Sequence, residues 1–333
     1  MDKVAFIVGE TFIYWNSILL TLAVAAAACL FVGFYVGKSG NALAATLAVP
    51  MAIAASTVCA RFVHWYCRSD SYLSFRAAMT DYTTGGYALL GVFAGCFAVA
   101  VVLRVLFISR DLPQMLDAMC LAGSAGIAVG RLACLYSSAD RGQIVEGLTA
   151  LPWVYPVANA VSGAPEYRLA TFVIQAMAAG AIFAGLTVFY MLGGRKRKSG
   201  DVTLLFLLLY GVSQVVLDST RYDSLFFRSN GFISVVQVFS ALGLGLAIVV
   251  YSVKMVKNRG FHGWYVLLWL VIAGCIGGAG YMEYHVQRHG DQAVFAYTVM
   301  SGCLAGAAVL TLVIRLLGQI KPKAEAEADA AEG

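Results

Sequence analysis

Charged and amide side chains interrupt several long apolar stretches of the sequence, and these residues have the clearest potential for chemistry. Arg61 closes one stretch, and Arg131 closes another, shortly before Asp140 and Gly142. An ionisable side chain within a membrane-spanning helix costs about 2.5–3.5 kcal/mol on insertion scales, so it is a functional candidate. The planar fork of arginine suits bidentate binding of phosphate. The sequence therefore predicts an anion site whose natural ligand is a lipid phosphate.

A further set of polar side chains recurs along one predicted helix at steps of four, four and three residues. The set comprises Tyr210, Gln214, Asp218 and Arg221. Residues at this spacing share one face of a helix, and Gln237 begins a similar pattern in the next apolar stretch. Two structural alternatives stay open. An arginine near a helix end can reach the interface without a ligand, and Asp218 with Arg221 can form an i, i+3 pair.

The elements that must position these residues are predicted to be membrane helices. The chain has 333 residues, of which 60% are hydrophobic and 12% charged, and its mean hydropathy is +0.79. An average soluble domain is about 45–50% apolar and about 25% charged, which excludes a soluble enzyme. The apolar runs are continuous, unlike the alternating segments of roughly 10 residues in β-barrels, and a spanning helix needs roughly 20 apolar residues. We predict spans at residues 12–36, 41–65, 84–108, 116–136, 169–192, 202–220, 232–253, 262–283 and 293–317.

Lysine and arginine in the loops predict the orientation. The densest basic cluster is 195–198, which the positive-inside rule assigns to the cytoplasm. Counting spans from it places the N-terminus outside and the C-terminus inside. Four polar residues then fall in the outer half of the membrane, namely Arg61, Arg131, Asp218 and Arg221. The net charge of +5 is an orientation signal and does not indicate nucleic-acid binding.

Neither the cysteines nor the histidines predict a metal, a cofactor or a disulfide framework. Most of the eight cysteines lie in apolar runs, where cysteine behaves as a small hydrophobe, and the sequence has no CxxC pair. His285 and His289 form an i, i+4 pair that lacks the glutamate of a zincin motif. The first apolar run has no basic n-region or cleavage site, so we expect no removed signal peptide.

Taken in order, these residues resemble the motifs of the prolipoprotein diacylglyceryl transferase family over the region from Tyr14 to about Tyr251. The family has a tyrosine in its first helix, an Ala-Arg pair ending the second and a Gly-Gly pair opening the third. These are similar to Tyr14, Ala60-Arg61 and Gly85-Gly86. The family's fourth helix has an Asp and then a Gly-Arg pair, followed by a Gly, which are similar to Asp117, Gly130-Arg131 and Gly142. Its Tyr-Gly…Arg…Glu…Arg helix is similar to Tyr210-Gly211 with Gln214, Asp218 and Arg221. Its Gln-x-x-Ser motif is similar to Gln237 with Ser240.

The chain departs from the family pattern at several motif positions. The replacements are Leu90 for a histidine, Cys134 for an asparagine, Ala139 for an acidic residue, Gln214 for an arginine, Asp218 for a glutamate, and 168–171 for a His-Pro-x-Gln motif. The chain therefore resembles a divergent member of the family.

The apolar runs predict an all-α integral membrane protein of about nine transmembrane helices. The resemblance implies a seven-helix diacylglyceryl transferase-like core at residues 1–258, so the two helices at 259–320 are an addition to it. The composition of residues 321–333 predicts a disordered cytosolic tail. It also implies an enzyme of the bacterial cytoplasmic membrane, among membrane lipids. That enzyme would transfer a diacylglyceryl group from phosphatidylglycerol to the lipobox cysteine of a prolipoprotein signal peptide, and no cofactor is implied.

Roles in that reaction follow from residue type. Arg131 and Arg221 are our candidates for holding the departing phosphate, and Asp140 or Asp218 could accept the proton of the thiol. Arg61 either binds the same phosphate or anchors the second helix. The implied substrate-binding set is Tyr14, Arg61, Gly85, Gly86, Gly142, Tyr210, Gln214 and Gln237.

Two other functions compete with the transferase. One is a non-catalytic lipid- or lipoprotein-binding membrane protein that kept the fold. The other is a transporter, which is disfavoured because transporters usually show repeated halves and helices broken at the bilayer midplane, and this sequence shows no internal repeat.

Overall fold

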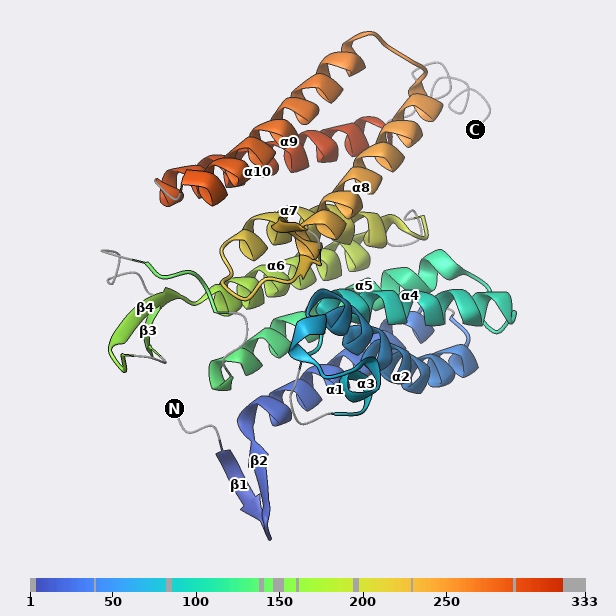
Figure 1. The fold of residues 1–333 in the computed structure, drawn as a ribbon. Helices are drawn as coiled ribbons and strands as arrows, with labels where there is room; N and C mark the ends of the chain where they lie inside the picture. Colours follow the sequence, from blue (N-terminus) through green and yellow to red (C-terminus); the bar gives the residue numbers. More distant parts are fainter. Residues whose placement is uncertain are drawn as a thin grey trace. The chain divides into compact units, whose positions relative to one another are not determined.

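The structure is a computed structural model that describes residues 4–38, 40–81, 86–137, 141–145, 153–159, 162–193, 198–228, 230–289 and 292–319. Within these ranges the chain forms two compact units. Unit 1 contains the residues up to Phe206 together with Thr220–Val236, and unit 2 contains Leu207–Ser219 together with the residues from Gln237 onward. Helices dominate both units (Figure 1).

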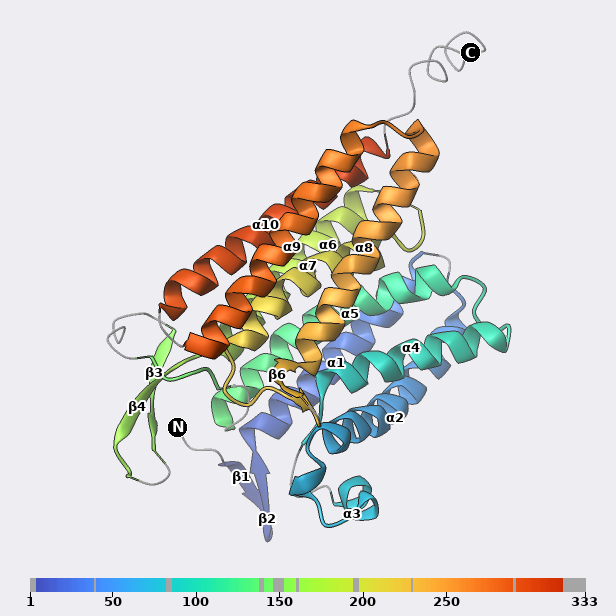
Figure 2. The ribbon, with the colours of Figure 1, turned by 45° about the horizontal axis from the view of Figure 1, so that its top comes forward.

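Unit 1 is built from the first apolar runs of the sequence. Its long helices are α1 (Trp15–Val36), α2 (Ala42–Cys67), α4 (Leu89–Val105), α5 (Leu112–Leu132), α6 (Thr171–Leu192) and the first residues of α7 (Asp201–Ser219). Its short helices are η1 (Ser69–Ser71), α3 (Phe75–Thr80) and η2 (Ala133–Tyr136). Helix α1 packs on α5, α2 packs on α4, and α5 packs on α6, so these helices lie side by side (Figure 2).

Three antiparallel hairpins complete unit 1. They pair β1 (Val4–Val8) with β2 (Thr11–Tyr14), β3 (Val154–Ala158) with β4 (Pro165–Leu169), and β5 (Phe226–Phe227) with β6 (Asn230–Ser234). The sequence did not predict these strands. They are only two to five residues long and lie in connections between the apolar runs.

Unit 2 contains the later part of α7 and the helices α8 (Val235–Arg259, from Gln237), α9 (Trp264–His289) and α10 (Ala293–Leu317). Helix α9 packs on α10. Gly211 of α7 lies so close to α8 that a Cβ atom there would be 2.8 Å from the carbonyl oxygen of Ser240. The lack of a side chain at Gly211 therefore allows the two backbones to approach.

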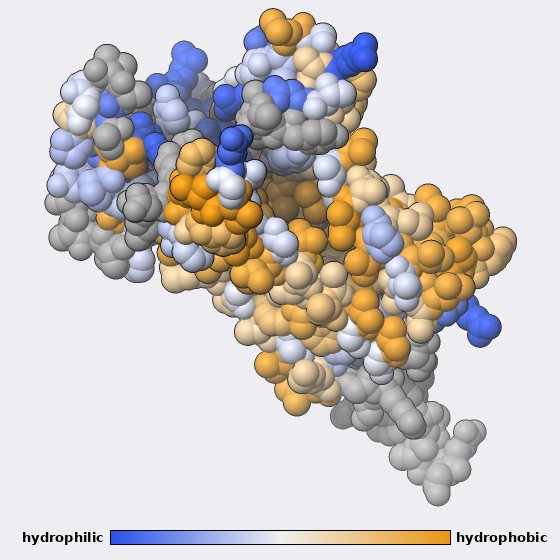
Figure 3. Space-filling model, turned by 90° about the horizontal axis from the view of Figure 1, so that it is seen from below, coloured by the Kyte–Doolittle hydropathy of each residue, from blue (hydrophilic) through white to orange (hydrophobic). Residues whose placement is uncertain are grey.

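The helices confirm an all-α integral membrane protein. Eight described helices are long and apolar enough to span a membrane, and α4 is a shorter apolar helix of 17 residues. Each of the nine predicted spans overlaps one of these nine helices, although several helices begin or end a few residues outside the predicted bounds. The helix in the span predicted at 84–108 is shorter than expected. Large apolar side chains such as Leu22, Leu267 and Leu270 are more than half exposed, and hydrophobic residues cover broad areas of the visible surface (Figure 3). Such a surface suits lipid better than water.

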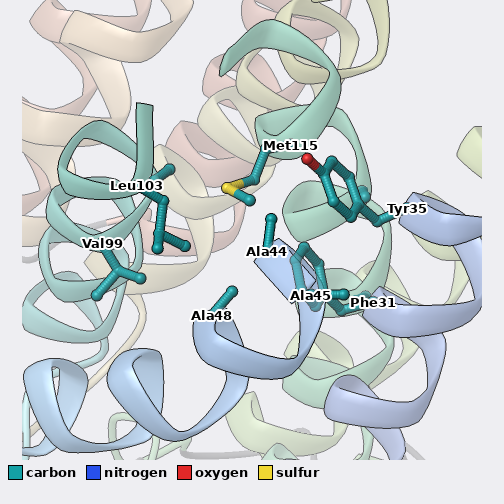
Figure 4. Packing of buried hydrophobic residues seen from close by; sticks show 11 residues of the cluster. Phe31, Tyr35, Ala44, Ala45, Ala48, Val99, Leu103 and Met115 are labelled. Carbon is teal, nitrogen blue, oxygen red and sulfur yellow. The ribbon is translucent and has the colours of Figure 1, made fainter. Parts of the chain in front are cut away.

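Small residues let the helices of unit 1 pack closely. Ala44, Ala45 and Ala48 of α2 are buried in a core that also contains Leu103 and Met115 (Figure 4). Two glycines of α4 face the backbone of α2. A Cβ atom at Gly91 would overlap the backbone of Cys59 and Ala60, and one at Gly95 would lie 2.6 Å from Ser56 Cα.

A buried carboxylate joins α5 to the start of α7. Asp117 accepts hydrogen bonds from the backbone N–H of Gly200 (2.9 Å) and of Thr203 (2.8 Å), and from the Thr203 hydroxyl (2.8 Å). These donors belong to the first turn of α7, whose N–H groups have no partner within the helix. Asp117 therefore caps α7 from a neighbouring helix.

Candidate functional site

Several helix ends of unit 1 meet at one end of that unit. The ring of Trp15, at the start of α1, lies 6.0 Å from that of Tyr136, just after α5. Thr171, the first residue of α6, shares a hydrogen bond of 3.1 Å with Thr220. All three hairpins also lie at this end (Figure 2). We call it the hairpin end, and it carries the unit 1 candidates for phosphate binding.

Residues 141–145 hold the connections at the hairpin end together. On one side, Gly142 N–H donates to the carbonyl of Leu169 at 2.9 Å. On the other side, Gln143 N–H donates to the carbonyl of Thr220 at 3.0 Å. Gly142 is buried, and a Cβ atom there would overlap the carbonyl oxygen of Leu169. The segment 141–145 therefore lies between β4 and the chain that follows α7, hydrogen-bonded to both.

Arg168, in β4, is held in place by three neighbours. Its Nη2 donates to Glu166 Oε2 at 2.9 Å, and its Nη1 donates to the carbonyl of Gly142 at 3.3 Å. Its guanidinium carbon lies 4.8 Å from the centre of the Tyr222 ring, in a cation–π contact. These contacts orient a largely buried guanidinium at the hairpin end.

Arg221 is oriented by a carboxylate two residues further along the chain. Its Nε and Nη2 donate to Asp223 Oδ1 at 3.2 and 3.0 Å. Its backbone pairs with that of Gly142. Arg221 is thus fixed both through its main chain and through its side chain.

Tyr155, in β3, faces two arginines of the same end. Burial raises the pKa of its phenol, while the guanidinium groups of Arg141 and Arg168 lower that pKa. Arg141 Nε is buried and has no hydrogen-bond partner within the part of the chain that the structure describes. A buried donor of this kind is costly unless a ligand or water satisfies it, so Arg141 joins the candidates for anion binding.

Arg131 lies in the last turn of α5 and is partly buried. The preceding residue, Gly130, faces α1, where a Cβ atom would lie 3.7 Å from Ala23 Cβ. Tyr14 caps the start of α1 and is 45% exposed. Both residues belong to the hairpin end, as their positions at the end of α5 and the start of α1 require.

Arg61 is fully buried and binds backbone atoms. Its guanidinium donates to the carbonyl groups of Ala78, Asp81 and Gly86, and the last bond is 3.0 Å long. Its guanidinium carbon also lies 5.1 Å from the Tyr72 ring centre. Three carbonyl acceptors, one in α3 and two between α3 and α4, favour the anchoring role over phosphate binding.

Gly86 has a backbone conformation that suits glycine. Its φ is +87°, a region that L side chains rarely adopt. A Cβ atom there would also lie 2.6 Å from the His64 ring and from the Tyr72 hydroxyl, which themselves share a hydrogen bond of 2.8 Å. Glycine at this position therefore lets the chain pass close to Arg61 and its neighbours.

The remaining described candidates lie in unit 2 and are buried there. They are Tyr210, Gln214 and Asp218 on α7, and Gln237 on α8. Gln237 Nε2 donates to the carbonyl of Val215 at 3.2 Å, which joins α8 to α7. Gly85 and Asp140 lie outside the described residues, as do most of the basic cluster 195–198 and the tail.

Sequence reasoning did not select Arg168, Tyr222 or Asp223 for the site. The sequence comparison with the family motifs included Arg168 only as part of a poorly matching segment, and Tyr222 and Asp223 lie just beyond a predicted helix. A signal was available for Arg168, because it stands two residues after Glu166 in a short segment that alternates in polarity. No group of three metal-binding side chains occurs among the described residues.

The fold and the site define a polytopic membrane protein whose unit 1 concentrates arginines at one end of its helices. Residues 3–253 match the family described as prolipoprotein diacylglyceryl transferase, and the chain belongs to that family. Helices α9 and α10 follow the matched region.

Curated relatives agree with the family match. A phosphatidylglycerol–prolipoprotein diacylglyceryl transferase of Finegoldia magna is 27% identical over 266 residues, which cover 78% of this chain and 97% of that protein. A protein of the same name from Streptococcus pneumoniae is 29% identical over 215 residues, which cover 62% of this chain and 75% of that protein.

Proposed function

We propose that this protein transfers a diacylglyceryl group from phosphatidylglycerol to the lipobox cysteine of prolipoproteins, at the outer face of the bacterial cytoplasmic membrane. The observation that carries the proposal is the set of arginines at the hairpin end of a chain that belongs to this family. These arginines are Arg131, Arg141, Arg168 and Arg221. The names of the relatives supply the donor and the acceptor.

The reaction requires cations where negative charge develops. The thiolate sulfur attacks the diacylglyceryl carbon that carries the phosphate, so a C–S bond forms and a C–O bond breaks. The electron pair of the broken bond goes to the phosphate oxygen, and glycerol phosphate leaves. Preorganised cations beside such an oxygen commonly contribute several kcal/mol to the transition state, and in our proposal Arg131 and Arg221 have this role.

The same cations would assist the nucleophile. A free thiol has a pKa of about 8.5, which nearby positive charge lowers. The proton of the thiol would pass to Asp218 or Asp140. Tyr210, Gln214, Gln237, Tyr14 and the glycines would bind the lipid and the acceptor peptide.

The orientation in the membrane is part of the proposal. The end of unit 1 opposite the hairpin end carries basic residues, among them Lys38, Arg104, Arg110 and Lys198. Cytoplasmic loops are enriched in such residues, which supports a cytoplasmic position for that end and an outer position for the hairpin end. We also propose that residues 1–258 form the transferase core and that residues 259–320 add two helices to it.

A non-catalytic lipid- or lipoprotein-binding protein is the second candidate. It is favoured by Leu90 and Gln214, which replace a histidine and an arginine of the family pattern. Such a protein would keep the phosphate-binding arginines without the transfer step.

The test is transfer from labelled phosphatidylglycerol to a lipobox peptide, with the purified full chain in detergent. Three proteins are compared: the wild type, Arg131→Ala, and Arg104→Ala as a control for an exposed arginine at the opposite end. We expect transfer by the wild type and the control, and a loss of about 100-fold or more in Arg131→Ala. If the wild type binds phosphatidylglycerol without transferring it, the binding protein replaces the transferase. If Arg131→Ala transfers normally, the assigned role of Arg131 is wrong.

A further inference from the structure

A cavity of about 320 Å³ lies in unit 1 where the end of α2 meets the chain that follows α7. None of the residues predicted for the transferase site lines it. Its polar lining includes Arg68, Ser69, Asp70, Tyr222, Ser224 and Arg228, together with the thiol of Cys67. Its volume falls within the range of about 300–1,000 Å³ that is usual for small-molecule sites.

Two arginines line this cavity, and one hydrogen bond is found for each of them among the residues that the structure describes. Arg68 Nη2 donates to the carbonyl of Asp223 at 3.3 Å, and Arg228 Nε donates to the carbonyl of Tyr66 at 2.8 Å. No ion pair with a carboxylate is found for either arginine within the described ranges of the chain. A guanidinium has five N–H donors in a planar fork, so both can bind a phosphate while keeping these backbone anchors.

Aromatic side chains hold Arg228 and give the cavity an apolar side. The guanidinium carbon of Arg228 lies 4.9 Å from the centre of the Trp65 ring and 5.3 Å from that of Tyr66. Phe226 and Phe227 also line the cavity. Tryptophan and tyrosine at the end of a membrane helix are typical of the depth of lipid headgroups.

We propose that this cavity binds the phosphate ester of a phospholipid headgroup, with Arg68 and Arg228 on the phosphate oxygens. The Ser69 hydroxyl donates to Asp70 Oδ1 at 3.4 Å, so the remaining lone pairs of Asp70 and Ser69 accept from hydroxyl groups beyond the phosphate. A lipid fits better than a solute because Arg68 directly follows the spanning helix α2, Arg228 is bonded to the last turn of that helix, and phenylalanine rings line the same cavity. The cavity adjoins the candidate site, because Tyr222 lines the cavity and also contacts Arg168, but the proposal does not depend on the transfer step.

Cys67 provides a reporter within the cavity. Cys67 lines the cavity and is partly exposed. Cys59, in the same helix, is also partly exposed but does not line the cavity. The full chain in maltoside micelles, which carry no phosphate, is treated with a maleimide, and labelling of each cysteine is followed by peptide mass spectrometry. Phosphatidylglycerol is added to one sample and soluble glycerol 1-phosphate to another.

We expect phosphatidylglycerol to slow the labelling of Cys67 about tenfold when present at about ten times its Kd, with Cys59 unchanged. The double variant Arg68→Gln/Arg228→Gln should lose this protection. The matched double variant Arg76→Gln/Arg104→Gln, which removes two exposed charges elsewhere in unit 1, should keep it. If glycerol 1-phosphate slows the labelling of Cys67 and phosphatidylglycerol does not, the cavity binds phosphate but its ligand is a soluble molecule, and the lipid assignment is wrong.

The absence of protection by either ligand would overturn the proposal, and so would protection that survives in Arg68→Gln/Arg228→Gln. If that double variant melts at a lower temperature than the wild type, Arg68→Gln/Arg228→Lys replaces it. The lysine keeps the charge beside Trp65 but lacks the fork, so protection should still fall.

Discussion

Replacing Arg61 by methionine is expected to destabilise unit 1 strongly. The Arg61 side chain is 1% exposed and donates to three backbone carbonyl groups. A hydrogen bond to a charged group contributes about 1.5–3 kcal/mol, but the freed carbonyls will partly relax toward water. We therefore expect a loss of about 3–5 kcal/mol, the usual cost of breaking a buried charged interaction. For a unit of this size the loss corresponds to a fall in Tm of about 6–20 °C.

The measurement is thermal unfolding of the purified protein in detergent, followed by the exposure of buried thiols. Arg61→Lys should recover part of the loss, because lysine keeps the charge but cannot reach three separated carbonyls with a planar fork. Arg104→Met, at an exposed position of α4, serves as the control and should change the free energy of unfolding by no more than about 0.5 kcal/mol. An Arg61→Met protein that melts like the wild type yet no longer binds phosphatidylglycerol would refute the anchoring role and assign Arg61 to the ligand.

Three further predictions concern stability and share that assay. Gly91→Ala should lower the free energy of unfolding by about 1–3 kcal/mol, because its Cβ would overlap the backbone of α2. The control is Gly123→Ala, where a Cβ meets nothing within 4 Å. Equal melting temperatures of the two variants would contradict the close packing of α2 and α4. Asp117→Ala should lower the free energy of unfolding by about 2–3 kcal/mol, because three donors at the start of α7 lose their acceptor. Thr203→Val removes only one of the three bonds and should lower it less. A larger loss in Thr203→Val than in Asp117→Ala would argue against the cap. Hydrogen bonds from Asn159 and then from Arg168 hold the pKa of Glu166 below its usual value of 4.5. This carboxylate therefore contributes stability above the usual pKa and loses it as pH falls through the lowered value. Glu166→Gln should flatten the acid side of the profile of Tm against pH, and an unchanged profile would show that the β3–β4 contact does not matter for stability.

The membrane helices could be predicted because their signal is local and repeated. A run of about 20 apolar residues has few alternatives to a spanning helix, and all nine described long helices coincide with such runs. The hairpins carry no comparable signal. The strands β5 and β6 are two and five residues long, which is too short for a clear alternating pattern.

The site could be predicted only in part, for a similar reason. Arg131 and Arg221 stand out because a charge next to an apolar run is visible in the sequence. The contact of Arg168 with Gly142 joins residues 26 positions apart, and that of Arg68 with Asp223 joins residues 155 apart. No local pattern encodes such a pair, so the cavity at Arg68 and Arg228 was not predicted. The role of Arg61 as an anchor was one of two open alternatives, and its backbone partners became visible only in the folded chain.

The segment 141–145 is joined to β4 and to the chain after α7 through main-chain atoms. Five described backbone hydrogen bonds make these connections. Such bonds do not depend on which side chain each residue carries, apart from Gly142, where the space for a Cβ is missing. The exposed positions 143 and 144 can therefore carry other side chains while the loop keeps its geometry. The same property makes these two positions suitable for saturation mutagenesis, since a library there would vary the surface beside Arg168 and Arg221 while most of its members still fold.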